Sequence, residues 1–393
     1  MKTSFIIHAL GLSAALLAST SAQAADKLKI GFLTTLSGPG AVNGQAIRDG
    51  FTLALKMNEG KLGGLPVEIT VADDQANPVA SRQVVERFLK RDNVDLITGP
   101  VFSSVVLPIV PGILRANTIF LSPNTGPADY AGEKCDPYFF AVGTQNEDIP
   151  QAMGEFANEQ GYKRIALIAP NYPGGREILF GFKRRYKGDV VGEVYTKLGQ
   201  LDYSAEIGSL KDSKPDGVFY FLPGSMGINF VKQYNASGLR RTAPLLTTGF
   251  TADTPNIAAL GKDIVGTLNS SQWSADLPNE ANKKFVEAFE KEYGQLPDIF
   301  ASQGYDTAML IDGAVRRIGG KVEDRAAFQK ALKDANFQSV RGAFKFNNNH
   351  YPIHNIYMRQ VIEDENGNLR NKLIGTVLKE HGDPFAATCS MKQ

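Results

Sequence analysis

The chain has 393 residues, of which 43% are hydrophobic and 21% charged, a composition typical of a soluble globular protein with more than one core. Lysine and arginine number 42 and aspartate and glutamate 41, so the formal net charge is +1. Without a net charge of either sign, the composition gives no support for nucleic acid or an anionic membrane as a partner.

The first 24 residues are typical of a secretory signal peptide. Lys2 precedes a largely apolar run from Phe5 to Leu17, and small residues follow up to Ala24, where we expect cleavage. That run is too short to span a membrane, and no later run reaches about 18 apolar residues. No cysteine lies near the cleavage site to carry a lipid. We therefore expect a periplasmic protein that does not insert into the membrane.

Strand and helix patterns alternate through the first part of the mature chain. Strands are expected at 27–33, 66–72, 94–98 and 118–121, and helices at 43–57, 79–91 and from Ser103 onward. This order predicts an α/β fold, a doubly wound and mostly parallel sheet with helices on both faces. Each strand ends in a loop of small residues, and ligands of such sheets bind beyond the carboxyl ends of the strands.

The same alternation then begins again and predicts a second sheet. Its strands are expected at 164–169, 190–195, 216–222, 244–247 and 264–270, and its helices at 149–159, 177–186, 203–210 and 226–237. Two such units predict two lobes that face each other over a cleft. After Trp273 come helices at 279–293, 299–318 and 325–335 and short strands at 343–346, 356–362 and 372–377, with a hairpin turn at Asn366-Gly367.

Two serines stand where the strand at 94–98 gives way to a helix. Ser103 and Ser104 follow Gly99-Pro100 and precede an apolar run. The start of a helix presents free N–H groups and a positive dipole end, which together bind carboxylates and phosphates. The alternative is that both serines only cap their own helix.

The chain has two cysteines, Cys135 and Cys389. In an oxidising compartment an even pair suggests one disulfide, which in the chain-entropy model stabilises by roughly 4–5 kcal/mol. The alternative is two buried thiols.

Motifs for cofactors are absent from the sequence. No G-x-G-x-x-G follows the first strand, and no G-x-x-x-x-G-K-[ST] occurs, so we expect no nucleotide cofactor. His350 and His354 have the spacing of a helical metal-binding pair, but Pro352 between them breaks that helix. We therefore expect no metal site.

One segment is similar to the nucleophile elbow of serine hydrolases. Pro223-Gly224-Ser225-Met226-Gly227 follows a predicted strand and precedes a helix, and histidines follow later in the chain. The first position of an elbow is normally Gly, and the fixed φ of Pro223 opposes the strained turn. A serine hydrolase acting through Ser225 is thus a distant alternative to a tight turn that closes the cleft, and we expect no enzymatic activity.

With its signal, two lobes and loops, the mature chain resembles the type I periplasmic solute-binding proteins of ABC importers, the branched-chain amino-acid-binding class. The segments that carry the resemblance are Thr34 to Pro39, Asp73-Asp74, Gly99 to Ser104, Ser122 to Thr125, Asn171 to Gly175 and Gly304-Tyr305-Asp306.

The resemblance implies three strands that cross between the lobes, near Val142, Ser274 and Phe344. After the signal peptide at 1–24, lobe 1 would then comprise 25–142 and 275–343, and lobe 2 would comprise 143–274 and 344–393. It also implies a monomer that hands its ligand to membrane permease subunits. A ligand sensor that signals to a membrane receptor would use the same fold.

The resemblance further implies the site residues. Ser103, Ser104, Asn124 and Thr125 match the loops that hold the ligand carboxylate, and Tyr172 matches an aromatic residue that closes over the ligand. The remaining residues expected to line the pocket are Ser37, Phe102, Pro223, Gly224, Phe250 and Phe300.

One departure from the family bears on the ligand. Amino-acid binders place an acidic residue after the strand at 244–247 to pair with the ammonium, whereas this chain has Thr248-Gly249-Phe250-Thr251. Burying an ammonium without a carboxylate partner costs several kcal/mol. The chain is thus similar to the subgroup that takes up aromatic acids, such as benzoate or cinnamate derivatives, including the positions of its two cysteines. The alternative is a branched-chain or other hydrophobic amino acid, with Asp253 moved in as the amine partner and the aromatic side chains serving as ordinary core.

Overall fold

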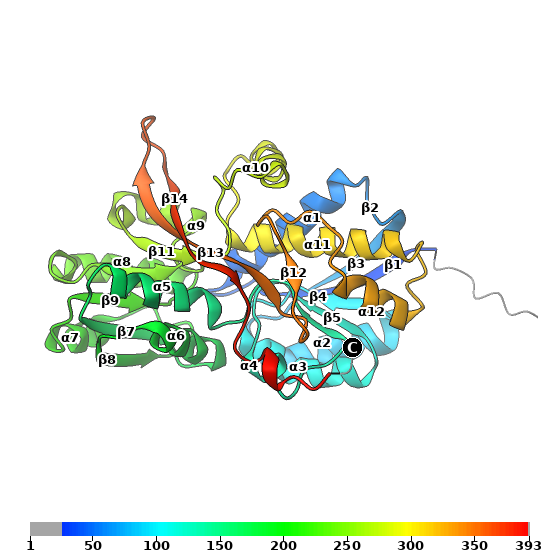
Figure 1. Ribbon diagram of the computed structural model, residues 1–393, viewed down its shortest axis with the longest axis horizontal. Helices are drawn as coiled ribbons and strands as arrows, with labels where there is room; N and C mark the ends of the chain where they lie inside the picture. Colours follow the sequence, from blue (N-terminus) through cyan, green and yellow to red (C-terminus); the bar gives the residue numbers. More distant parts are fainter. Residues whose placement is uncertain (1–25, 392–393) are drawn as a thin grey trace, which may run out of the picture.

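The computed structural model describes residues 26–391, in which two sheets and their helices form two lobes side by side (Figure 1). The predicted signal peptide lies outside the described residues. Within residues 26–391, no helix has the length and hydropathy needed to cross a membrane. We call the sheet at the N-terminal end and the helices that cover it the first lobe, and the other sheet with its helices the second lobe.

The first sheet has six strands in the order β2-β3-β1-β4-β5-β6, parallel except at the edge strand β2. Its strands are β1 Leu28–Thr34, β2 Lys61–Leu62, β3 Leu65–Asp73, β4 Leu96–Thr98, β5 Ile119–Ser122 and β6 Phe139–Ala141. Successive residues of a strand face opposite sides of the sheet. In β1, Ile30 and Phe32 therefore join one apolar cluster and Leu33 another.

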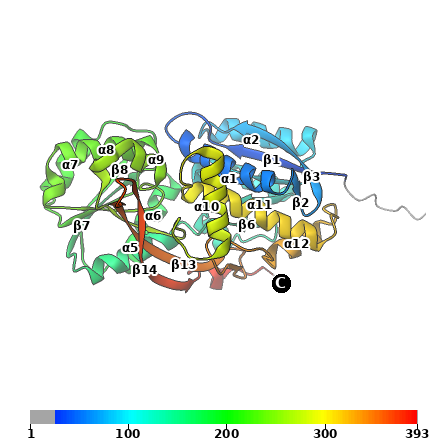
Figure 2. The ribbon, with the colours of Figure 1, turned by 90° about the horizontal axis from the view of Figure 1, so that it is seen from above.

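Helices cover both faces of the first sheet. Residues of α1 and α11 pack with Ile30 and Phe32, whereas residues of α2 and α3 pack with Leu33. The helices of this lobe are α1 Ala41–Met57, α2 Pro78–Arg87, α3 Ser103–Arg115, α4 Ala128–Ala131, α10 Glu280–Tyr293, α11 Ile299–Arg317 and α12 Arg325–Lys333. Both views show α11 and α12 on the side of the first lobe, so helices from late in the chain complete it (Figures 1 and 2).

The second sheet has eight strands, with the path β12-β13-β11-β10-β9-β7-β8 and β14 paired to β13. Its strands are β7 Arg164–Pro170, β8 Asp189–Thr196, β9 Gly217–Tyr220, β10 Leu245–Thr248, β11 Leu268–Ser271, β12 Lys345–Phe346, β13 Pro352–Glu363 and β14 Leu369–His381. Its helices are α5 Asp148–Glu159, α6 Pro173–Arg185, α7 Ser204–Asp212, α8 Ser225–Ala236 and α9 Thr254–Leu260. Ile165 and Leu167 face α5 and α6, while Ala166 and Ile168 face α7 and α8.

Each sheet has one point where its winding reverses. In the first sheet, β1 lies between β3 and β4, and in the second, β7 lies between β8 and β9. Loops that leave the strands at such a point diverge to opposite faces and form a crevice for ligands. The segments after β4, β7 and β9 contain several of the predicted site residues, and the others lie after β1, β5 and β10 and in α11.

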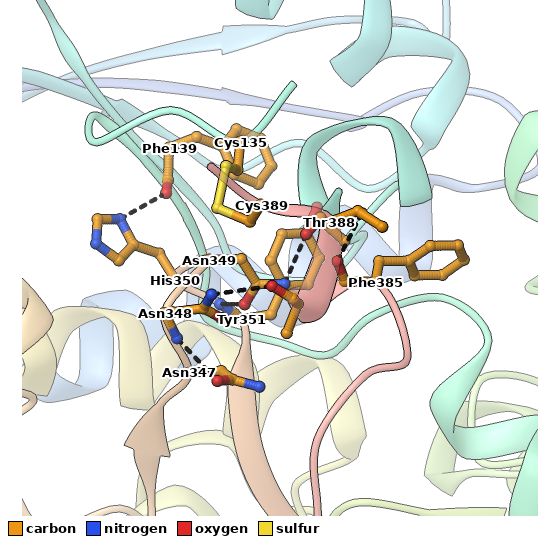
Figure 3. The surroundings of a disulfide bond; sticks show 12 residues. Cys135, Phe139, Asn347, Asn348, Asn349, His350, Tyr351, Phe385, Thr388 and Cys389 are labelled. Carbon is orange, nitrogen blue, oxygen red and sulfur yellow. Dashed lines mark hydrogen bonds between the residues drawn. A yellow bond between two sulfur atoms is a disulfide. The ribbon is translucent and has the colours of Figure 1, made fainter. Parts of the chain in front are cut away.

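The C-terminal part of the chain returns to the first lobe. Cys135 and Cys389 are bonded, which confirms the predicted disulfide (Figure 3). Nearby, Asn349 Nδ2 donates to Ala131 O at 2.7 Å, and Ala141 N donates to His350 O at 3.1 Å. Residues near 347–351 and 389 thus lie against elements of the first lobe, whereas the predicted lobe boundaries as a whole stay a prediction.

The mostly parallel α/β prediction is confirmed, and so is the Asn366-Gly367 hairpin, which joins the antiparallel strands β13 and β14. The sequence pattern missed β2, β6, α4 and α9, which are all short. It also placed the start of α6 at Glu177, whereas the helix begins at Pro173. Proline has no N–H to lose at the first position of a helix, which is why the helix starts there.

Candidate functional site

A cavity lies where loops of the two lobes meet. The first lobe contributes residues from α1, from α11 and from the segments that follow β4 and β5, and the connection after β6 contributes one more. The second lobe contributes residues that follow β7, β9 and β10. Its lining residues are Asn43, Val101, Phe102, Asn124, Thr125, Asn146, Tyr172, Gly174, Ile178, Phe221, Pro223, Phe250 and Phe300. The reversal points of both sheets therefore contribute to one cavity.

Most of the residues predicted for the pocket line this cavity, namely Phe102, Asn124, Thr125, Tyr172, Pro223, Phe250 and Phe300. Four others stand outside its lining. Ser37 lies beside the Asp73 carboxylate, and Gly224 lies so close to Pro39 that a Cβ would stand 2.4 Å from the Pro39 oxygen. Ser103 and Ser104 begin α3 directly behind the wall. Their roles in binding stay predictions.

Sequence reasoning missed six of the lining residues: Asn43, Val101, Asn146, Gly174, Ile178 and Phe221. Gly174 belongs to a loop motif already singled out, Val101 adjoins Phe102, and Phe221 lies two residues before Pro223. Asn43 and Asn146 carry no local signal, because they reach the cavity only through the packing of α1 and of the segment before α5.

Aromatic rings form much of the wall and come from both lobes. Phe102 and Tyr172 meet edge to face, with ring centroids 5.9 Å apart and planes at 79°. Phe250 contacts Phe221 at 6.2 Å and Phe300 at 5.7 Å between centroids. Rings in such contacts hold each other in orientation, so they present a preformed apolar surface.

The interpretation that Ser103 and Ser104 only cap their own helix, α3, was wrong. Phe102 is the N-cap residue, Ser103 and Ser104 are the first two helical residues, and no side chain caps the helix. Within residues 26–391, no acceptor lies within hydrogen-bond reach of the N–H groups of Ser103 and Ser104, and the buried Ser104 hydroxyl has no partner. These groups are suited to an anion at the positive end of the helix dipole.

The hydroxyls of Ser103 and Thr125 belong to a closed ring of hydrogen bonds with Asn146. Asn146 Nδ2 donates to Ser103 Oγ at 3.0 Å, Ser103 Oγ contacts Thr125 Oγ1, and Thr125 Oγ1 donates to Asn146 Oδ1 at 3.0 Å. Gly126 N also donates to Asn146 Oδ1 at 2.9 Å, which fixes the orientation of the amide. We call these three side chains the Ser103–Thr125–Asn146 ring.

Two asparagines present unpaired polar atoms to the cavity. Asn124 Nδ2 donates to Val101 O at 2.7 Å, which leaves its Oδ1 buried without a partner. Asn43 Nδ2 is likewise buried and unpaired within the described chain, and the residue is 4% exposed. An unpaired buried polar atom costs about 1–3 kcal/mol, so these atoms are suited to hydrogen-bond a polar ligand.

No acidic or basic side chain is among the lining residues in the described part of the chain. Asp253, the alternative partner for an amine, lies elsewhere: its carboxylate contacts the Arg359 guanidinium at 3.2 Å and accepts from Ile299 N at 3.0 Å. Turning it into the cavity would leave the buried Arg359 without its counter-charge, which is costly.

The other candidate groups have partners of their own. Ser225 Oγ contacts Pro39 O at 3.4 Å, while His350 stacks on Phe140 at 4.2 Å and His381 contacts Asp148 at 3.2 Å. Trp273 is buried outside the cavity lining, with its Nε1 donating to Asn282 Oδ1 at 2.7 Å. Among residues 26–391, no group of three His, Cys, Asp or Glu side chains is placed to hold a metal ion.

Two lobes joined over a cleft at the reversal points of their sheets define a type I solute-binding architecture. The profile of the periplasmic binding protein family matches residues 27–368, and the chain belongs to that family. The resemblance noted in the sequence is thereby confirmed.

Proteins similar to this chain include a Leu/Ile/Val-binding protein homolog and complexes with benzoate-type acids. The chain is 27% identical to the Leu/Ile/Val-binding protein homolog 6 of Brucella melitensis biotype 1, over 93% of this chain and 95% of that protein. A solute-binding protein of an ABC transporter from R. palustris, in complex with benzoate, is 30% identical with a TM-score of 0.88, over 93% of this chain and 100% of the other. One from Rhodopseudomonas palustris BisB5, in complex with 3,4-dihydroxybenzoic acid, is 26% identical with a TM-score of 0.84, over 92% and 99%.

Proposed function

We propose that this protein captures a small aromatic carboxylate, of the benzoate class, for import by an ABC transporter. The observation that carries the proposal is the combination of an aromatic cavity without charged lining residues and the unpaired N–H groups at the start of α3. The two benzoate-type complexes among the similar structures support it.

Each half of such a ligand has a matching part of the site. The ring would lie among Phe102, Tyr172 and Phe250, where burying apolar area is worth about 25 cal/mol per Å². The carboxylate would accept from the N–H groups of Ser103 and Ser104 and from the Ser104 hydroxyl. Charge-assisted hydrogen bonds of this kind contribute about 1.5–3 kcal/mol each.

Isothermal titration calorimetry with a matched set of compounds tests the proposal. Benzamide removes the charge of benzoate, cyclohexanecarboxylate removes the flat ring, and L-leucine adds the amine. We expect benzoate to bind more tightly than all three, and at about 100 times its Kd to stabilise the protein by ~2.7 kcal/mol. Tight binding of benzamide would contradict the anion site, and tight binding of leucine alone would contradict the ligand class.

A pair of variants tests the ring contacts. Phe250→Leu removes a cavity ring, while Phe180→Leu removes an aromatic side chain that is 51% exposed on α6. We expect the first to weaken benzoate binding by about tenfold, since it loses a packed ring contact, and the second to leave it unchanged. Equal effects would contradict the placement of the ring.

A hydrophobic amino acid is the second candidate, and the Asn124 Oδ1 acceptor is the observation that favours it. An ammonium is a donor, as is a ring hydroxyl, and either would satisfy that oxygen. Without a carboxylate in the lining, the ammonium would keep most of its desolvation cost. The desolvation cost of a neutral ring hydroxyl is much smaller, so a hydroxylated benzoate is the better partner for Asn124 Oδ1.

We further propose that the protein acts in the periplasm as a monomer, delivers its ligand to permease subunits, and has no catalytic role for Ser225. The Ser225 hydroxyl contacts a backbone oxygen, and its turn closes against Pro39. Ser225→Ala should leave benzoate binding intact. Hydrolysis of p-nitrophenyl acetate by the parent protein, lost in that variant, would support the hydrolase alternative instead.

A further inference from the structure

A carboxylate from the second lobe reaches across to the first lobe beside the cavity. Glu177 is the fifth residue of α6, and its Oε1 accepts from the N–H of Ala128, in α4 of the first lobe, at 3.0 Å. Its Oε2 accepts from Asn146 Nδ2. In the described chain no Lys, Arg or His side chain forms an ion pair with it, so two neutral N–H groups hold it.

The Asn146 amide connects this carboxylate to the hydroxyls behind the cavity wall. Because Gly126 N donates to Asn146 Oδ1, both amide hydrogens are committed, one to Glu177 and one to Ser103 Oγ. Thr125 can then only donate to Asn146 Oδ1, so the Ser103 hydroxyl donates to Thr125. Glu177, which accepts one amide hydrogen, and Gly126 N, which donates to the amide oxygen, together set the direction of the Ser103–Thr125–Asn146 ring.

The surroundings of Glu177 disfavour its negative charge. Burial raises its pKa to about 7, two hydrogen bonds oppose that rise, and the carboxylates of Glu147 and Asp129 add to it. Tyr172, the N-cap residue of α6, and Tyr351, which directly precedes β13, also interact with it, and burial keeps both neutral by raising their pKa values. Arg184 on α6 is paired with Glu147 at 2.7 Å.

We propose that Glu177 is a positioning residue for the ligand site: it ties the closed lobes together and orients, through Asn146, the Ser103 and Thr125 hydroxyls at the cavity wall. This inference rests on the cleft binding a ligand, not on the ligand's identity. When the lobes open, the bond to Ala128 breaks and the carboxylate returns to water. Closure around a ligand thus takes up a proton on Glu177 in neutral solution.

The test is the pH dependence of binding in Glu177→Gln, with Glu159→Gln, an exposed acid on α5, as the matched control. Benzoate and L-leucine are both titrated from pH 6 to pH 8, where neither carboxylate changes charge, and the one that binds is followed. The Glu177 carboxyl binds its proton more tightly in the closed form, so the affinity of the protein for its ligand is highest at low pH. We expect the parent protein and Glu159→Gln to bind about tenfold more weakly at pH 8 than at pH 6.

Glu177→Gln should lose this dependence. At pH 6, where Glu177 is protonated in the closed form, the neutral amide should bind the ligand within a few-fold of the parent protein, and at pH 8, where the parent residue is charged, the variant should bind it more tightly than the parent. A parent protein with a flat profile, or a variant that keeps the parent slope, would overturn the inference. If only leucine binds, the proposed ligand class fails while this test still runs.

If neither benzoate nor L-leucine binds, the melting temperature of the ligand-free protein tests the inference about Glu177 instead. Because its pKa is raised, Glu177 costs the closed form stability as the pH rises from about 4.5 through 7, so the parent protein should lose a few degrees relative to Glu177→Gln between pH 5 and pH 8. Parallel curves for the two proteins would overturn the inference.

Discussion

Asn in place of Asp306 should strongly destabilise the protein, because Asp306 neutralises a buried arginine between the lobes. Arg341 Nε donates to Asp306 Oδ2 at 2.9 Å, and both side chains are within 1% of full burial. The guanidinium also donates to Val142 O at 2.8 Å and Gly143 O at 2.7 Å, on the first connection between the lobes. Asp306 further accepts from Val340 N at 3.0 Å.

The magnitude follows from the loss of one partner of a buried pair. Asp306→Asn keeps the shape but leaves the Arg341 charge uncompensated, which costs about 3–5 kcal/mol. Urea denaturation followed by the fluorescence of Trp273, the only tryptophan in the sequence, measures the change in the free energy of unfolding. Glu280→Gln, which breaks the exposed pair with Lys283, is the control, and we expect it to cost less than about 1 kcal/mol.

A second variant separates charge from packing. In the double variant Asp306→Leu with Arg341→Met the uncompensated charge is gone, so we expect it to be more stable than Asp306→Asn. If Asp306→Asn costs no more than the Glu280→Gln control, the reasoning about this buried pair is wrong.

Three further predictions concern the disulfide, the cleft and the buried acids. Replacing Cys135 and Cys389 by Ser should lower the free energy of unfolding by roughly 2–5 kcal/mol in urea, and an unchanged value would mean that the bridge constrains little. Gly174→Ala should abolish tight ligand binding in calorimetry, since its Cβ would lie 2.9 Å from Ser103 Oγ; unchanged binding would contradict the close approach of α6 to α3. Burial and the neighbouring Asp253 raise the pKa of Asp298 to about 7, above its ordinary 3.8, so this group costs stability as the pH rises from about 4 through 7. Asp298→Asn should therefore gain melting temperature relative to the parent protein between pH 5 and pH 8, and parallel curves would contradict the raised pKa.

Local sequence patterns predicted most of the fold. The alternation of apolar strands with amphipathic helices placed the strands of both sheets, because each element must bury one face or stripe. Short elements escaped prediction: β2 has two residues and α4 has four, so each spans about one period and shows no repeating pattern. Nothing local indicates that residues near 347–351 lie beside β6, because that contact joins segments about 210 residues apart.

The candidate site was predicted in part, for a similar reason. Loops at strand ends and the family resemblance placed Phe102, Thr125, Tyr172 and Phe250 together, since the carboxyl ends of parallel strands share one edge. The hydrogen bonds that decide the chemistry depend on tertiary contacts. Asn124 offers an acceptor rather than a donor because its Nδ2 already donates to Val101 O. Glu177 reaches the first lobe beside the cavity from the second lobe. Neither contact can be predicted from residue spacing in the sequence.

A crystal structure of the protein with benzoate bound tests the central claim most directly. We predict the carboxylate within hydrogen-bond distance of the N–H groups of Ser103 and Ser104, and the ring between Phe102, Tyr172 and Phe250. An empty cleft after soaking at saturating benzoate, or a co-purified zwitterion whose ammonium is held by an acidic side chain, would contradict the account.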